Sequence, residues 1–318
     1  MDRRLSNFYQ ANDKETFLTE IALFFHRNNI ISCPEVILRE IFDKTQKKLG
    51  KPIEYDKMLH ELIVNTNLIV RNEKENFEFR HLSFQEYFVA SEMVIKNKAE
   101  ELINYFPNEW WNQVLYFFCG IRKDNEDLLP KIIQKTSSIQ NKEKFNAVWE
   151  LGYLIQSSYK THADLREIFI KEAITTYSKI VPEAVGEFLK QSKKIPEVLL
   201  YLSLSFIFTI HFKSRYLLEI FKKIYGKLIA ENKNNFEDAF SIFLIGFILS
   251  ELGELDYLAQ SGQYFKGFPL IELLQETELR MGIEKIKDKA ERRTIKGISK
   301  DIMKKIKRSP DLYKKYIE

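Results

Sequence analysis

The fold of this chain is decided by the stretch LIVRNEKENFEFRHLSFQEYFVA, residues 68–90. Residues 68–71 are rich in β-branched side chains, residues 72–76 are polar, and residues 77–80 alternate apolar and charged side chains. A period of two is typical of a strand with one buried face, and a polar segment between two such runs is typical of a turn. The stretch therefore predicts a β-hairpin, and it is the clearest hairpin pattern in the chain.

Directly after this hairpin the pattern becomes helical. Ser83 and Glu86 have the spacing of a capping box, in which Ser83 is the N-cap and Glu86 the third helical residue. Leu82 and Tyr87 have the positions of a hydrophobic staple. Because capping accounts for Glu86, we assign it no chemistry.

Three helical segments precede the hairpin. The first carries one apolar stripe at helical spacing, formed by Phe17, Leu18, Ile21, Phe24 and Phe25. Ser32 is placed to cap the second helix, with Glu35 reaching back, and the third helix spans about residues 54–66. Three helices followed by a two-stranded wing is the element order of a winged-helix domain, which we place at residues 1–97.

Residues 98–318 show only helical patterns. We expect an irregular α-solenoid of HEAT-like helical hairpins, with a break near Phe265 to Pro269 before the last two helices. The predicted fold class is thus mainly α, with a winged-helix domain first and the solenoid after it. The expected helices lie near residues 109–121, 125–136, 143–157, 163–178, 182–192, 196–211, 214–231, 235–251, 266–281 and 283–308.

Composition agrees with a helical protein. The chain has 318 residues, 45% of them hydrophobic, with only 11 glycines and 8 prolines, which disfavours a turn-rich β-sandwich. Its longest uncharged stretch, residues 198–212, and the stretch of residues 239–250 are both shorter than the ~20 residues that span a bilayer. The N-terminus lacks the apolar run of a signal peptide, and Cys33 and Cys119 are too few for a disulfide scaffold. We expect a cytoplasmic protein without a membrane partner.

Charge is concentrated at the C-terminal end. Residues 280–318 hold 14 Lys and Arg against 6 Asp and Glu, a net charge of +8, although the whole chain is only +4. Such a segment can bind nucleic acid, a membrane surface or an acidic partner, or it can be a solvated lysine-rich helix. We favour the solvated helix and keep nucleic acid as an alternative.

Sequence motifs for catalysis are absent. The chain has no phosphate-binding P-loop, no Gly-x-Gly-x-x-Gly, no Cys-x-x-Cys and no nucleophile elbow, and its five histidines are scattered. We therefore expect no enzyme active site, no metal site and no cofactor held by this chain alone.

A winged helix can also bind DNA through its third helix. The charged residues of that helix are Glu54, Asp56, Lys57 and Glu61, a net charge of −2, and the three cations of the wing are matched by three glutamates. DNA binding depends on cations that contact phosphates. The charges therefore favour a regulatory or protein-interaction module over a DNA-binding domain.

The twelve residues FRHLSFQEYFVA, residues 79–90, resemble the Phe-x-His-x-Ser-Phe-Gln-Glu-Tyr-x-x-Ala signature of the NACHT family of STAND ATPases. These signal-transducing ATPases act in innate immunity, including antiphage defence. With the stretch from Phe17 to Cys33, which is similar to the start of the family's winged helix, the resemblance covers residues 14–95, about a quarter of the chain. It implies a winged helix that controls the ADP-bound closed state, followed by a sensor region that binds a trigger or partner protein.

The resemblance also implies a role for His81. In the family the matching histidine contacts the β-phosphate of ADP, and the Walker motifs that bind ADP or ATP with Mg²⁺ would lie before residue 1. The chain resembles the C-terminal part of such a protein and is not expected to hydrolyse ATP alone. The alternative is that His81 bonds a backbone carbonyl where the strand meets the helix.

Two other functions stay open. The chain could be a free-standing solenoid that binds proteins, with Trp110 or Trp111 as an anchor if one ring is exposed on a concave face. It could also bind nucleic acid through residues 280–318, which salt-dependent retention would reveal.

Overall fold

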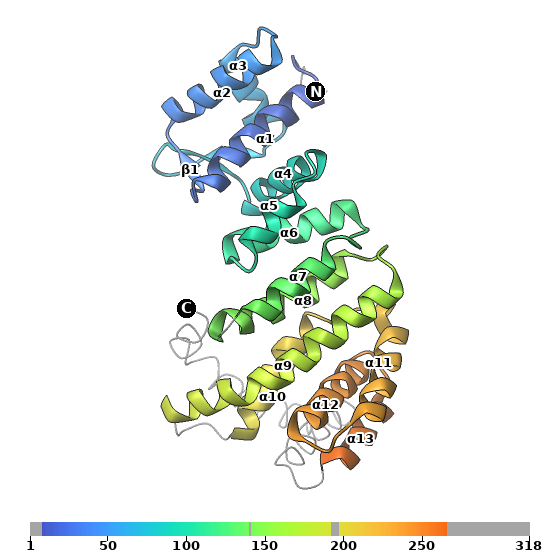
Figure 1. Ribbon diagram of the computed structural model, residues 1–318. Helices are drawn as coiled ribbons and strands as arrows, with labels where there is room; N and C mark the ends of the chain where they lie inside the picture. Colours follow the sequence, from blue (N-terminus) through green and yellow to red (C-terminus); the bar gives the residue numbers. More distant parts are fainter. Residues whose placement is uncertain (1–7, 140, 192–196, 266–318) are drawn as a thin grey trace, which may run out of the picture. The chain divides into compact units, whose positions relative to one another are not determined.

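The computed structural model describes residues 8–139, 141–191 and 197–265 (Figure 1). These residues form thirteen α-helices, short 3-10 and π turns and one small antiparallel sheet. The protein is therefore mainly helical, as the sequence predicts. The described residues divide into two compact units, one that ends at residue 123 and one that begins at residue 124.

The first unit begins with the element order of a winged-helix domain. Two further helices, α5 and α6, then belong to the same unit, so it extends past residue 97, where the sequence places the domain boundary. The reason is that α6 packs directly on α4. Its elements are α1 (Ala11–Arg27), β1 (Ser32–Cys33), α2 (Glu35–Leu49), α3 (Tyr55–His60), a π turn (Glu61–Asn65), β2 (Ile69–Arg71), β3 (Phe77–Phe79), α4 (Leu82–Ile95), α5 (Ala99–Tyr105) and α6 (Glu109–Arg122).

The hairpin of β2 and β3 is confirmed, but the sheet has a third strand that the sequence analysis missed. Ser32 and Cys33 pair with Glu78 and Phe77, and the strand order is β1-β3-β2. Ser32 therefore does not cap α2, whose N-cap is Pro34. A two-residue strand is visible only once its partner is in place, because two residues are too few to show alternation.

The apolar stripe of α1 forms the centre of this unit. Phe17, Ile21 and Phe25 are buried, and Phe17 stacks on Phe42 of α2 with ring centroids 4.7 Å apart. Phe25 meets Phe79 of β3 edge to face at 6.1 Å. Burial of each such side chain stabilises the fold by roughly 1.5–3 kcal/mol, so α1 holds the helices and the sheet together.

The predicted capping box at the start of α4 is wrong. The helix begins at Leu82 with His81 as its N-cap, and no side chain caps it. Glu86 instead lies buried in the unit, where desolvation raises its pKa. Leu82 and Tyr87 are both exposed, so they form no buried staple. The helix turns its Gln85, Glu86 and Val89 side inward because α1 and α6 pack on either side of it.

The second unit is helical throughout its described part. Two helices predicted at residues 163–178 and 182–192 are one helix, α9, with Pro182 inside it. An internal proline costs about 3 kcal/mol in an isolated helix, but α9 contacts five other helices, and Tyr177, Val181 and Val185 are buried beside the proline. The elements are α7 (Leu129–Ser138), α8 (Asn141–Ser157), α9 (Ala163–Gln191), α10 (Glu197–Ile210), a 3-10 turn (Arg215–Leu217), α11 (Leu218–Glu231), α12 (Phe236–Glu251), α13 (Leu255–Ser261) and a 3-10 turn (Gly262–Phe265).

The other helix predictions that fall on described residues match, whereas α5 and α13 were not predicted. Past residue 97 the described residues contain no strand, as expected. The helices predicted at 266–281 and 283–308, most of the break that precedes them and the basic segment 280–318 lie outside the described residues.

Packing in the second unit centres on α9 and α12. Tyr177 of α9 stacks on Phe208 of α10 with ring centroids 4.0 Å apart, and α12 is buried along most of its length. In a solenoid each hairpin contacts only its neighbours, whereas α9 contacts α7, α8, α10, α11 and α12. The solenoid stays a prediction.

Candidate functional site

His81 lies at the exposed junction between the sheet and α4. Its backbone carbonyl accepts a hydrogen bond from Phe84 N at 3.0 Å, which begins the helix. Its imidazole is exposed and lies 5.8 Å from the ring of Phe84, measured between centroids. Within the described residues the imidazole has no hydrogen-bond partner. The alternative that His81 holds the junction by bonding a backbone carbonyl is therefore not what the structure shows.

The neighbouring residue Arg80 takes the structural role instead. Its guanidinium donates to the backbone carbonyl of Asn67 at 3.1 Å and also to the Asn67 side chain. Arg80 N donates to the carbonyl of Leu68 at 2.9 Å. The junction is thus held by Arg80, which leaves the imidazole of His81 available to a ligand or partner.

Gln85 of the same signature lies inside the unit, next to His26. Gln85 Nε2 is 3.3 Å from His26 Nδ1, and both side chains are fully buried. Trp110 Nε1 donates to the carbonyl of His26 at 2.8 Å, and its ring stacks on the imidazole at 4.8 Å. Trp111 meets the same imidazole edge to face at 4.5 Å. Both tryptophans therefore join α6 to α1, and neither is an exposed anchor.

Burial also sets the charge state of His26. Desolvation lowers the pKa of His26 from 6.5 to about 4. The imidazole is therefore neutral at physiological pH. A neutral, stacked imidazole joins α1, α4 and α6 in the core of the unit.

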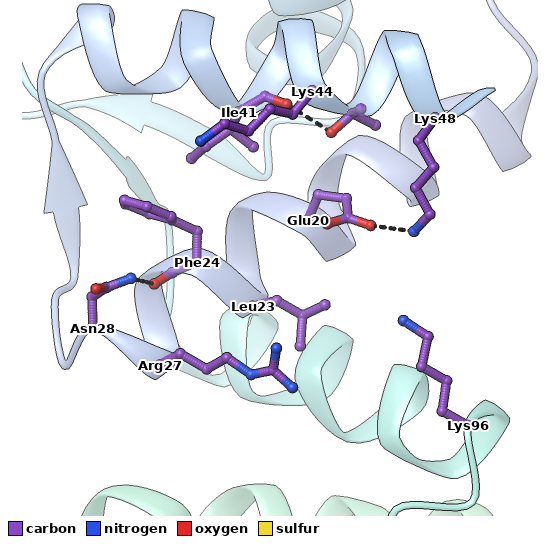
Figure 2. A pocket seen from close by; sticks show the side chains of 10 residues that line it. Glu20, Leu23, Phe24, Arg27, Asn28, Ile41, Lys44, Lys48 and Lys96 are labelled. Carbon is purple, nitrogen blue, oxygen red and sulfur yellow. Dashed lines mark hydrogen bonds and ion pairs between the residues drawn. The ribbon is translucent and has the colours of Figure 1, made fainter. Parts of the chain in front are cut away.

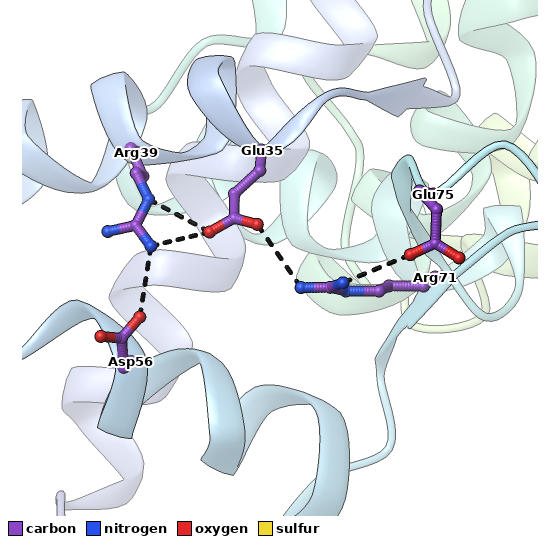
Figure 3. A network of polar contacts seen from close by, with 5 residues as sticks. All are labelled: Glu35, Arg39, Asp56, Arg71 and Glu75. Carbon is purple, nitrogen blue, oxygen red and sulfur yellow. Dashed lines mark hydrogen bonds and ion pairs between the residues drawn. The ribbon is translucent and has the colours of Figure 1, made fainter.

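Near the wing, which a DNA-binding winged helix would place against DNA, Arg39 and Arg71 form ion pairs with carboxylates. Glu35 lies between two guanidinium groups, with Arg39 at 2.7 Å and Arg71 at 3.4 Å (Figure 3). Arg39 also pairs with Asp56 at 3.3 Å, and Arg71 with Glu75 at 3.3 Å. Three carboxylates against two guanidinium groups leave this network with a net charge of −1. It gives no basic surface for phosphates.

Glu61, which the sequence analysis counts on the third helix, is not on its surface. Its side chain is fully buried, accepts hydrogen bonds from the backbone N–H groups of Phe8 and Tyr9, and pairs with Lys14 at 3.1 Å. It joins the π turn to the segment before α1. The remaining charges of the third helix, Glu54, Asp56 and Lys57, still sum to −1.

A pocket of about 380 Å³ opens between α1, α2 and the C-terminal end of α4 (Figure 2). Apolar atoms of Leu23, Phe24 and Ile41 form part of its wall. The charged residues that line it are four cations and one carboxylate: Arg27, Lys44, Lys48, Lys96 and Glu20. This pocket was not predicted from the sequence. Its only local signal is the spacing of Lys44 and Lys48, which places two cations on one face of α2.

The described part of the chain holds no group of three or more His, Cys, Asp or Glu side chains that could bind a metal ion. None of the helices in that part combines the length and the apolar character that crossing a membrane requires. Cys33 and Cys119 are both buried.

Comparisons with protein-family models, with curated proteins and with solved structures give no match for this chain.

Proposed function

We propose that this chain is the regulatory and sensor part of a NACHT-like STAND ATPase. In this proposal the first unit stabilises the ADP-bound closed state of a nucleotide-binding core, and the helices of the second unit bind a trigger or partner protein in the cytoplasm. The observation that carries the proposal is the exposed imidazole of His81, which has no hydrogen-bond partner among the described residues and lies within the signature FRHLSFQEYFVA.

The position of His81 suits a phosphate contact. The residue is the N-cap of α4, a helix of 14 residues, and the N-terminal end of a helix favours anions through its free N–H groups and its dipole. An imidazole N–H can donate a hydrogen bond to a phosphate oxygen. Contact with ADP bound elsewhere would favour the closed state by the free energy of that bond.

The chain itself has no chemistry in this proposal. ADP or ATP with Mg²⁺ would be held by the Walker motifs of the core, to which the chain adds one contact. Isothermal titration of the chain with ADP and Mg²⁺ should accordingly give no binding at micromolar concentrations, because no P-loop is present in the sequence. A dissociation constant near ~1 µM would contradict this.

The decisive experiment replaces His81 by alanine in a protein that contains both the core and this chain. Loss of a hydrogen bond to a charged phosphate costs roughly 1.5–3 kcal/mol, which is about a 10- to 150-fold shift toward the open state. The expected result is signalling without a trigger, with ADP released faster.

His60→Ala is the matched control, because His60 is also exposed and lies on α3 of the same unit. In the chain alone, both variants should melt within about 2 °C of the wild type, since substitutions at exposed sites usually change stability by less than 0.5 kcal/mol. If His81→Ala lowers the melting temperature by many degrees, or leaves the closed state unchanged, His81 is not the phosphate contact.

A further inference from the structure

The pocket between α1, α2 and the end of α4 combines two kinds of surface. Leu23 and Ile41 are almost fully buried in the unit and form an apolar part of the wall together with Phe24. Arg27, Lys48 and Lys96 extend toward the same space from three different helix segments (Figure 2). An apolar wall with a few charged groups that converge is the usual composition of a small-molecule site.

Charge in and around the pocket is positive. The ion partners of its cations are Glu20 with Lys48, Glu101 with Arg27, and Glu92 with Lys96. Lys98 shares Glu101. Lys44 has no ion pair in the described part of the chain. Five cations and three carboxylates therefore give a local net charge of +2.

The existing ion pairs do not block the pocket. The side chains of Arg27, Lys48 and Lys96 are each about half exposed, at 52%, 57% and 49%. Exposed pairs contribute little to stability, so each cation can turn toward an incoming anion at small cost. Lys44 has no such pair to give up.

We propose that this pocket binds a small organic phosphate. Its apolar group would contact Leu23, Phe24 and Ile41, and its phosphate would be bound by Arg27, Lys44 and Lys96. A phosphate fits better than a single carboxylate because it carries up to two charges and offers three oxygens to donors that approach from several sides. The site lies away from His81 in the chain, and the inference does not depend on the proposed function.

The volume of the pocket favours a small phosphate ligand over a nucleic acid. The pocket volume of about 380 Å³ lies in the range of small-molecule sites, roughly 300–1,000 Å³. A nucleic-acid backbone needs a run of cations along an open surface, whereas here the cations surround one concave space. A small phosphate with one aromatic group matches both the volume and the apolar wall.

The test uses 1-naphthyl phosphate as the probe and the full chain as the protein. Titration at low ionic strength, followed by two-dimensional NMR of the isotope-labelled chain, should give saturable binding. The shifts should be confined to α1, α2 and residues near Lys96. Binding should weaken strongly in about 1 M salt, where the Debye length is about 3 Å.

Two variants and one control locate the site. Lys44→Glu reverses a charge in the pocket without removing an ion pair, and it should weaken binding by about ten-fold or more. Lys96→Gln should also weaken binding. Lys47→Glu is the control, because Lys47 is exposed on the same helix but does not line the pocket, and it should bind nearly as the wild type does.

Three results would overturn the proposal. The first is no saturable binding up to about 1 mM probe, or shifts that map outside the pocket. The second is equal weakening by Lys44→Glu and Lys47→Glu, which would mean diffuse attraction to surface charge. The third is binding of 1-naphthol or inorganic pyrophosphate as tight as that of 1-naphthyl phosphate, because the pocket would then recognise only one half of the ligand.

Discussion

Gly152 of α8 is predicted to be a site where one added methyl group destabilises the second unit. The helix crosses the backbone at His211 so closely that an ideal Cβ on Gly152 would lie 2.6 Å from the carbonyl oxygen of His211 and 2.7 Å from its carbonyl carbon. Two further contacts join α8 to His211: His211 Nδ1 lies 3.2 Å from the carbonyl oxygen of Trp149, and the Gln156 side chain donates a hydrogen bond to the carbonyl of His211. Glycine is thus required at position 152 because α8 lies so close to the backbone of His211, and not because of the φ and ψ angles of Gly152.

The magnitude follows from three opposing effects. Alanine favours a helix interior over glycine by about 1 kcal/mol. Overpacking a close contact costs about 1–3 kcal/mol, and displacing the hydrogen bond from Gln156 costs about 0.5–1.5 kcal/mol more. The overpacking and hydrogen-bond costs exceed the helix gain, so Gly152→Ala should lower the free energy of unfolding of the second unit by about 1–3 kcal/mol.

Gly226→Ala is the matched control. Gly226 lies inside α11, and a Cβ there would meet no atom within 4 Å. This change should therefore stabilise the unit by about 0.5–1 kcal/mol. Hydrogen exchange measured on peptides from α8 and α11 follows the second unit directly, and urea unfolding gives the free energy. If the two variants shift stability in the same direction, the close approach of α8 to His211 is not as described.

The remaining predictions concern the first unit. Burial lowers the pKa of His26 to about 4 in the folded chain. As the pH falls, His26 therefore binds a proton in the unfolded chain before it does in the folded chain. The free energy of unfolding thus decreases as the pH falls from about 6.5 to 4. The loss approaches roughly 3 kcal/mol. Urea unfolding across this pH range should show a steeper decline for the wild type than for His26→Gln, and parallel curves would contradict the assignment. Glu61→Ala leaves Lys14 and two backbone N–H groups without their buried carboxylate and should cost about 3–5 kcal/mol. Glu75→Ala, which breaks only the exposed pair with Arg71, should cost less than about 1 kcal/mol. Equal melting temperatures for these two variants would mean that the N-terminal segment is not held by Glu61.

Local patterns account for the helices and for the hairpin. The stripe of α1 and the alternation in β3 are periodic over a few residues, and periodicity reports which side of an element is buried. The same reasoning led to wrong details, among them two that concern α4 and α9. It placed a cap at Ser83 and a break near Pro182, because capping and proline rules describe an isolated helix. In the folded chain, α4 begins at Leu82 without a side-chain cap and buries Gln85 and Glu86, and the helices packed around α9 offset the cost of Pro182.

The sequence by itself determined the mainly helical class, the order of three helices followed by a hairpin, and the position of His81 between that hairpin and the next helix. The tertiary structure alone decided that Ser32 pairs with Glu78, that Glu61 and His26 are buried, and that the imidazole of His81 stays exposed. It also brought Arg27, Lys44 and Lys96 around one pocket. The physical reason is distance along the chain. Helix and strand periodicity depend on neighbours within one or two turns, whereas these pairings join residues tens of positions apart that meet only when the core forms.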